Sequence, residues 1–204
     1  MKTVPTSDNS RKYQTTNPMV RYLIDRFLRE VVNRVRLSRV RRVVDVGCGE
    51  GLVAAALRKA GMDIDYRGFD LRPEAVAAAR ELNPEWSFET ADLHALPIER
   101  GWADMVLCLE VLEHLNQPET ATAHLAAMTC KQALISVPWE PWFRIGSLCR
   151  GTYLQSWGNH PEHVQHFTHT SLRNLLQRSF CRVEMVPSVF PWILAQAGDP
   201  KQFS

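Results

Sequence analysis

A chain of 204 residues with 45% hydrophobic and 23% charged residues has the size and composition of one ordinary globular domain. These values exclude a disordered chain and a membrane-spanning one, and a net charge of only +2 excludes a general attraction to nucleic acid or anionic membranes. The first residues lack the apolar run of a secretory signal, so we expect a cytoplasmic protein. We expect residues 1–204 to form a single domain.

The first predicted element is a basic amphipathic helix over residues 17–37. Apolar residues recur at helical spacing from Val20 to Val35, and arginines lie elsewhere around the helix. Three roles are open for it. The simplest is packing across the mouth of a ligand site, and the others are peripheral contact with an anionic membrane and contact with RNA phosphates.

From residue 41 the chain alternates between short β-branched runs and helix-forming segments. We predict strands at residues 41–46, 64–69, 86–90, 104–109 and 133–137, and helices at 52–60, 73–82, 118–129 and 172–178. Two further strands, at 181–186 and 189–194, flank Pro187 and Ser188 and predict a closing hairpin. Together these elements predict an α/β fold with a doubly wound, mostly parallel seven-stranded sheet and an antiparallel C-terminal hairpin.

A long insertion at residues 138–169 separates a core at 41–137 from the C-terminal helix and hairpin at 170–204. It is rich in aromatic residues and carries four histidines. Connections of this length in a compact domain are usually functional. We therefore predict that the insertion is a lid over a substrate.

A glycine-rich turn follows the first predicted strand. Gly47, Gly49 and Gly51 alternate with other residues, and Asp45 stands ahead of them. Glycines at a strand-to-helix turn let the backbone approach a ligand closely, and the helix N-terminus favours anionic groups. The spacing differs from the dinucleotide fingerprint, and no Gly-Lys-Ser/Thr follows to form a phosphate-binding loop. The turn predicts a nucleotide-like ligand.

The segment Asp45-Val46-Gly47-Cys48-Gly49-Glu50-Gly51 resembles the first motif of class I S-adenosylmethionine-dependent methyltransferases of the small-molecule type. The resemblance covers about residues 41–137. It implies a Rossmann-like fold, an enzyme that transfers a methyl group, and the cofactor S-adenosylmethionine with S-adenosylhomocysteine as its product. It also implies that the cofactor lies at Asp45, Gly47, Cys48, Gly49 and Gly51.

Three later segments resemble further motifs of that family in the same order. Asp70 and Leu71 end the second predicted strand, from which a carboxylate can accept hydrogen bonds from ribose hydroxyls. Asp92 and Leu93 resemble the adenine-binding turn, and Glu110 ends the fourth strand, beside the methionine part of the cofactor. Local capping of turns is the alternative role for these aspartates.

An oxygen acceptor needs its proton removed, and histidine is the natural base near neutral pH. We predict that His114 and His163 are the catalytic residues, with His160 and His166 as further candidates. His114 is the best placed because it stands just beyond the fourth strand. The aromatic insertion predicts a small aromatic or lipid-like acceptor, and the near-neutral charge argues against nucleic acid.

Two other functions stay open. Glu110, Glu113, His114 and His163 resemble the metal ligands of small-RNA 2′-O-methyltransferases. Similar strings occur in metal-free small-molecule methyltransferases, and the five cysteines contain no Cys-x-x-Cys pair, so we expect no metal. The other alternative is a non-catalytic cofactor-binding protein that regulates an enzyme through its basic helix or aromatic surface.

Overall fold

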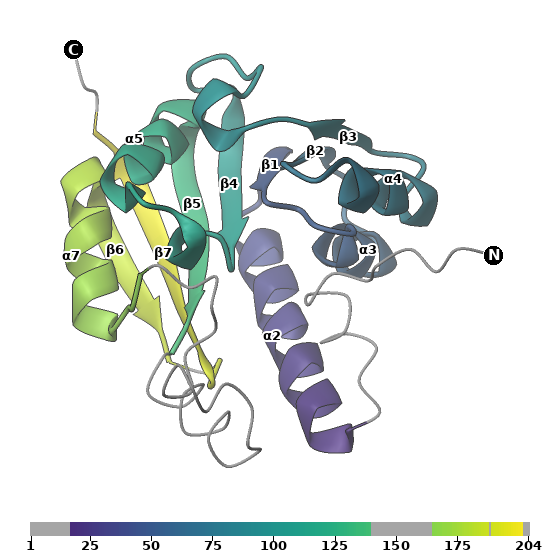
Figure 1. The fold of residues 1–204 in the computed structure, drawn as a ribbon, viewed down its shortest axis with the longest axis horizontal. Coiled ribbons are helices and arrows are strands. Elements are labelled where there is room, and N and C mark those ends of the chain that lie inside the picture. Colours follow the sequence, from purple (N-terminus) through teal and green to yellow (C-terminus); the bar gives the residue numbers. More distant parts are fainter. Residues whose placement is uncertain (1–16, 140–164, 188, 202–204) are drawn as a thin grey trace.

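The structure is a computed structural model that describes residues 17–139, 165–187 and 189–201. One seven-stranded sheet with the order β3-β2-β1-β4-β5-β7-β6 forms its centre (Figure 1). The strands are β1 (Arg42–Val46), β2 (Asp65–Asp70), β3 (Ser87–Thr90), β4 (Ala103–Leu109), β5 (Thr129–Pro138), β6 (Phe180–Val186) and β7 (Trp192–Pro200). Neighbours from β3 to β5 are parallel, whereas β7 pairs antiparallel with both β5 and β6. The predicted mostly parallel sheet with an antiparallel closing hairpin is confirmed.

Helices cover both faces of this sheet (Figure 1). One hydrophobic cluster lies under α2 (Pro18–Leu37), α3 (Leu52–Lys59) and α4 (Pro73–Leu82), and a second lies under α5 (Pro118–Met128) and α7 (His169–Ser179). Two short 3-10 turns, η1 (Leu93–Ala95) and η2 (Leu112–His114), flank β4. All seven residues of β4 are buried because helices pack on both of its faces.

The predicted N-terminal helix is present as α2. Asn17 caps it by accepting a hydrogen bond from the backbone nitrogen of Met19 at 2.9 Å, and Pro18 occupies the first turn, where a missing N–H costs nothing. Its buried face consists of Ile24, Phe27, Val31 and Val35. The helix therefore packs against the domain through its apolar side.

Two strand predictions had wrong bounds. The fifth strand begins at Thr129 instead of residue 133, because the Thr129 hydroxyl accepts hydrogen bonds from the backbone nitrogens of Lys131 and Gln132 and donates one to the carbonyl of Ala103. The last strand spans Trp192–Pro200 instead of residues 189–194. Pro191 has no N–H to donate, so the strand starts after it, and β7 is long because it pairs on both sides.

The two ends of the predicted insertion at residues 138–169 belong to regular elements. Pro138 belongs to β5, and α7 begins at His169 instead of residue 172 because Thr168 and Ser171 form a capping box. Residues 140–164, including His160 and His163, lie outside the described residues. Within the part of the chain that is described, no helix combines the length and the apolar character required to span a membrane.

Candidate functional site

Six of the predicted cofactor residues lie together at the carboxyl ends of the parallel strands, namely Gly47, Asp70, Leu71, Asp92, Leu93 and Glu110, whereas Gly49 and Gly51 lie outside the cavity lining found there. The strand order reverses between β1 and β4, and ligands of open α/β sheets bind in the crevice that such a reversal leaves. A cavity of about 540 Å³ lies there. Its lining consists of Val46, Gly47, Phe69, Asp70, Leu71, Arg72, Ala91, Asp92, Leu93, Glu110, Val111, His114 and Leu115.

Gly47 forms the floor of this cavity where the chain leaves β1. Its φ of +79° lies in the left-handed region, and a Cβ at this position would overlap the side chain of Val111. The backbone nitrogens of Gly47 and Cys48 donate to the carbonyl of Phe69 at 2.7 and 2.9 Å, which ties the turn to the end of β2. The glycine is therefore required both by the conformation of the turn and by the space beside it.

Asp70 lies at the cavity wall, as predicted, and also organises the glycine turn. One carboxylate oxygen accepts a hydrogen bond from the backbone nitrogen of Gly49 at 2.9 Å, and the other accepts one from the backbone nitrogen of Arg72 at 2.9 Å. The Arg72 guanidinium lies 3.4 Å from the same carboxylate and 3.8 Å from that of Glu50. The ends of β1 and β2 are thus held together by one buried carboxylate.

The segment after β3 forms a further wall. The carboxylate of Asp92 accepts a hydrogen bond from the backbone nitrogen of His94 at 2.9 Å and so caps η1. Leu93 is buried, whereas Leu71 is 69% exposed although it lines the same cavity. Apolar side chains of this kind suit a flat aromatic ring, while the carboxylates at the edge suit polar groups.

Glu110 follows β4 in a left-handed conformation, with a φ of +61°. Its backbone nitrogen donates to the carbonyl of Ser136 at 3.1 Å. Its carboxylate accepts from the Ser136 hydroxyl at 3.1 Å and from the indole nitrogen of Trp192 at 2.9 Å. A positive φ at a non-glycine residue is uncommon, and here it brings a carboxylate to the cavity wall.

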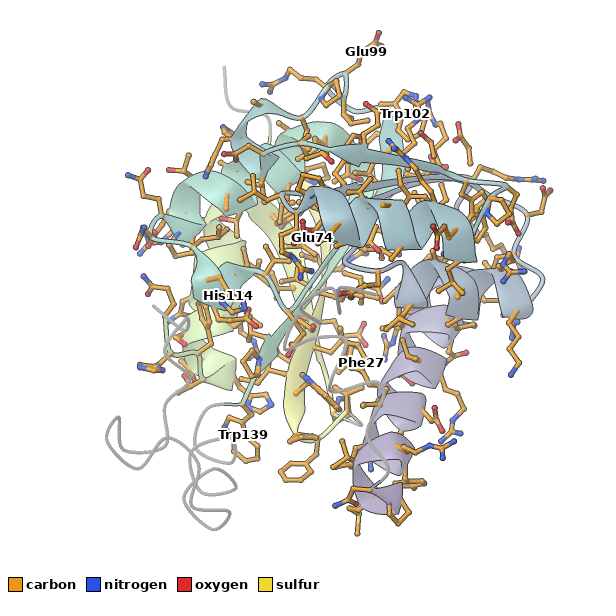
Figure 2. The ribbon with its side chains drawn as sticks, turned by 45° about the vertical axis from the view of Figure 1, so that its right-hand side comes forward. Phe27, Glu74, Glu99, Trp102, His114 and Trp139 are labelled. Atoms are coloured by element: carbon orange, nitrogen blue, oxygen red, sulfur yellow. The ribbon has the colours of Figure 1, made fainter. Side chains whose placement is uncertain are left out.

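His114 ends η2 and lines the cavity, as labelled in Figure 2. Its Nε2 lies 3.9 Å from a carboxylate oxygen of Glu113, which is 1% exposed. No group of three or more His, Cys, Asp or Glu side chains in the described ranges converges as metal ligands would, and the Glu110 carboxylate is bonded to Ser136 and Trp192. The other predicted catalytic residue, His163, lies outside the described residues.

Asp45 and Cys48 were predicted at the cofactor, and the structure places both beneath the glycine turn. Neither belongs to the residues that line the cavity. Asp45 is 2% exposed, and the Tyr66 hydroxyl donates to its carboxylate. Burial raises the pKa of Asp45 to about 7, although the bond from Tyr66 lowers it. Burial also raises the pKa of the Cys48 thiol, which keeps that group neutral.

The sequence did not predict Arg72, Ser136 and Trp192 as site residues, nor the apolar lining residues Val46, Phe69, Ala91, Val111 and Leu115. Arg72 lies over the glycine turn, and Ser136 and Trp192 hold Glu110. Arg72 had a signal, because it stands two residues after Asp70 and just before the Pro73 that opens a helix. Ser136 and Trp192 had none, since they come from distant parts of the chain.

A second hollow, of about 510 Å³, lies on α2 and is lined by Arg26, Arg29, Glu30 and Asn33. It contains none of the predicted cofactor residues. The cavity at the strand ends is therefore the candidate site.

Known proteins resemble this chain in sequence and in fold. A family model described as a methyltransferase domain matches residues 19–184. The ubiquinone biosynthesis O-methyltransferase of Bordetella avium (strain 197N) is 36% identical over 94 residues, which cover 43% of this chain and 38% of that protein. The one of Burkholderia pseudomallei (strain 1710b) is 31% identical over 136 residues, covering 60% of this chain and 55% of that protein. The chain thus spans between about two fifths and just over half the length of these relatives.

Solved structures share the fold at low sequence identity. Magnesium protoporphyrin IX methyltransferase from Synechocystis PCC 6803, crystallised with bound SAH, has a TM-score of 0.70 at 19% identity, covering 93% of this chain and 92% of that one. Human N-acetylserotonin methyltransferase has a TM-score of 0.67 at 18% identity, covering 97% of this chain and 61% of that one. Because the family model matches most of the chain, the protein belongs to the methyltransferase domain family, in agreement with its class I motifs.

Proposed function

We propose that this protein transfers a methyl group from S-adenosylmethionine to a hydroxyl group of a small acceptor. The observation that carries the proposal is the cavity at the ends of β1, β2 and β4, where Asp70, Asp92 and Glu110 stand around apolar walls. Family membership and the names of the curated relatives support the same reaction. S-adenosylmethionine supplies a methyl group already activated on a sulfonium.

The residues present fit this cofactor chemically. Gly47 leaves room for close approach of a ligand, Asp70 can accept hydrogen bonds from ribose hydroxyls, and Asp92 can accept one from an exocyclic amine. Leu71 and Leu93 offer apolar surface to a flat ring. Glu110 offers a carboxylate to a cationic amino group. The arrangement matches one adenosine with an amino-acid tail, and a cavity of about 540 Å³ is large enough for a ligand of that class.

His114 is the proposed general base. Its imidazole lies at the cavity wall, where it can take the proton of an acceptor hydroxyl as the oxygen attacks the methyl group. The buried Glu113 carboxylate beside it, at 3.9 Å, would stabilise the imidazolium that forms. We keep His163 as a second proposed base.

The acceptor is proposed to be a small hydroxylated aromatic or lipid-like molecule. The curated relatives are O-methyltransferases of ubiquinone biosynthesis, which favours an oxygen acceptor. Trp139 makes an edge contact with Phe190 at 5.9 Å and another with His169 at 5.6 Å, so aromatic rings gather beside the end of β5. We also propose that the described residues act as one catalytic domain, because a single sheet joins both hydrophobic clusters.

The test is methyl transfer with the purified protein. It is incubated with S-adenosylmethionine labelled in the methyl group and with either a panel of catechols and hydroxylated prenyl-aromatic compounds or a small RNA, with and without EDTA. We expect label in at least one acceptor and no loss of activity with EDTA. Transfer of label to a small RNA alone, with loss in EDTA, would contradict the proposal in favour of a metal-dependent RNA enzyme. Binding of the cofactor without transfer to any acceptor would favour a non-catalytic protein.

A further inference from the structure

Three separate strand ends meet at the carboxylate of Glu110. Glu110 follows β4, Ser136 lies in β5, and Trp192 opens β7. Ser136 pairs with Leu109 on one side and with Leu194 on the other, so β5 lies between the strand that precedes Glu110 and the strand that Trp192 opens. The Ser136 hydroxyl donates to one carboxylate oxygen at 3.1 Å, and the Trp192 indole nitrogen donates to the other at 2.9 Å.

These two bonds restrict a side chain that otherwise has many rotamers. A glutamate loses substantial rotamer entropy when it is fixed, and donors from two different strands supply that restriction before a ligand arrives. Hydrogen bonds to an ionised carboxylate are stronger than neutral ones, and an indole N–H can only donate. A carboxylate accepts about four hydrogen bonds, so two donors do not by themselves exhaust its capacity.

Trp192 is itself held from the far side by α2. Its ring lies 4.9 Å from the ring of Phe27, with 41° between the two planes. Phe27 is 3% exposed and extends from α2 toward the sheet (Figure 2). The backbone nitrogen of Trp192 donates to the carbonyl of Val189 at 2.9 Å, which fixes the start of β7. Through Phe27 and Trp192, α2 thus supports Glu110, which lines the cavity.

We infer that Trp192 is a positioning residue that holds the Glu110 carboxylate ready for the cationic amino group of the cofactor, with Ser136 as its second support. The inference rests on the proposed function, which places the amino-acid end of S-adenosylmethionine at Glu110. Trp192 acts only through Glu110. Its loss should therefore weaken ligands that carry the amino group and leave unaffected those that lack it.

Two ligands separate this role from a general structural one. S-adenosylhomocysteine carries the amino-acid tail, whereas 5′-deoxy-5′-methylthioadenosine shares the adenosine part but lacks the tail. Calorimetric titration measures the affinity of both for the wild type and for Trp192→Phe, which keeps a ring against Phe27 and removes the N–H. We expect S-adenosylhomocysteine to bind about tenfold more weakly, equivalent to about 1.4 kcal/mol, and methylthioadenosine to change less than about twofold.

Matched variants complete the test. Trp102→Phe is the control, because Trp102 lies outside the cavity lining and stacks on Arg67 at 3.9 Å, and both affinities should stay unchanged. Ser136→Ala should repeat the selective loss to a smaller extent, which keeps the inference testable if Trp192→Phe does not fold. Adding Trp192→Phe to Glu110→Gln should cost no further affinity, because the two residues act as one unit.

The outcomes are distinct. Equal loss of both ligands in Trp192→Phe, or unchanged binding of S-adenosylhomocysteine, overturns the positioning role while the proposed function stands. A wild-type protein that binds neither ligand overturns the proposed function and this inference with it.

Discussion

The carboxyl group of Asp45 gives stability an unusual dependence on pH. Burial raises its pKa from 3.8 to about 7, the bond from Tyr66 opposes this rise, and the charge of Asp70 adds to it. The folded protein therefore holds this proton more tightly than the unfolded chain does. The resulting stabilisation is fully present below about pH 4 and is lost as the pH rises through about 7. At about 1.4 kcal/mol per pKa unit, the loss is on the order of 4 kcal/mol.

The variant Asp45→Asn isolates this contribution, because an amide keeps the shape of the side chain, can still accept from Tyr66 and does not ionise. Urea unfolding followed by tryptophan fluorescence gives the free energy of unfolding of both proteins at pH 5 and pH 8. Between these values the variant should gain roughly 3 kcal/mol relative to the wild type. The ionisation of Asp104 does not affect the free energy of unfolding between pH 5 and pH 8. Its own burial raises its pKa, but bonds from Arg41, Arg42 and Lys131 outweigh this and lower it to about 2, so its contribution changes only below about pH 4. A difference between the two proteins that is constant from pH 5 to pH 8 would refute the reasoning.

Two further predictions concern the cavity. Gly47→Ala should weaken the binding of S-adenosylhomocysteine at least about tenfold in calorimetry, because the new methyl group overlaps Val111. Gly61→Ala is the control, because Gly61 has a similar φ of +68° but open space beside it. This control should leave the affinity unchanged and lower the free energy of unfolding by about 1 kcal/mol. Equal effects on binding would show that the cavity floor is not at Gly47. His114→Asn should lower kcat by about 10² to 10⁴ with cofactor affinity within about threefold, measured by label transfer and calorimetry, and undiminished turnover would remove His114 as the base.

The core of the fold was predictable because its signals are local. The apolar period of residues 17–37 and the β-branched runs around residues 42–46 and 104–109 each follow from spacing within one segment. The placement of Asp70 was equally predictable, because a residue at the end of the strand next to the glycine turn has to face the same crevice. Local sequence patterns and the parallel strand arrangement were together enough to predict where the cavity lies.

What could not be predicted depends on contacts between distant parts of the chain. Trp192 reaches Glu110 across 82 residues, and Ser136 reaches it across 26. Asp45 and Cys48 belong to the motif, yet neither lines the cavity. Asp45 faces the opposite side of β1 from Val46, which does line it, because successive residues of a strand alternate. Cys48 lies in the turn beyond the strand and is buried there. The position of β7 between β5 and β6 likewise follows from the whole sheet rather than from its own sequence.

We propose that Asp70 marks the site of an adenosine-containing cofactor, and a calorimetric titration with S-adenosylhomocysteine tests this most directly. The wild type and Asp65→Asn, an exposed position on the same strand, should bind with equal affinity. Asp70→Asn should bind at least about tenfold more weakly, because a charged acceptor for the ribose hydroxyls is lost. Absence of binding by the wild type, or full affinity in Asp70→Asn, would contradict the account.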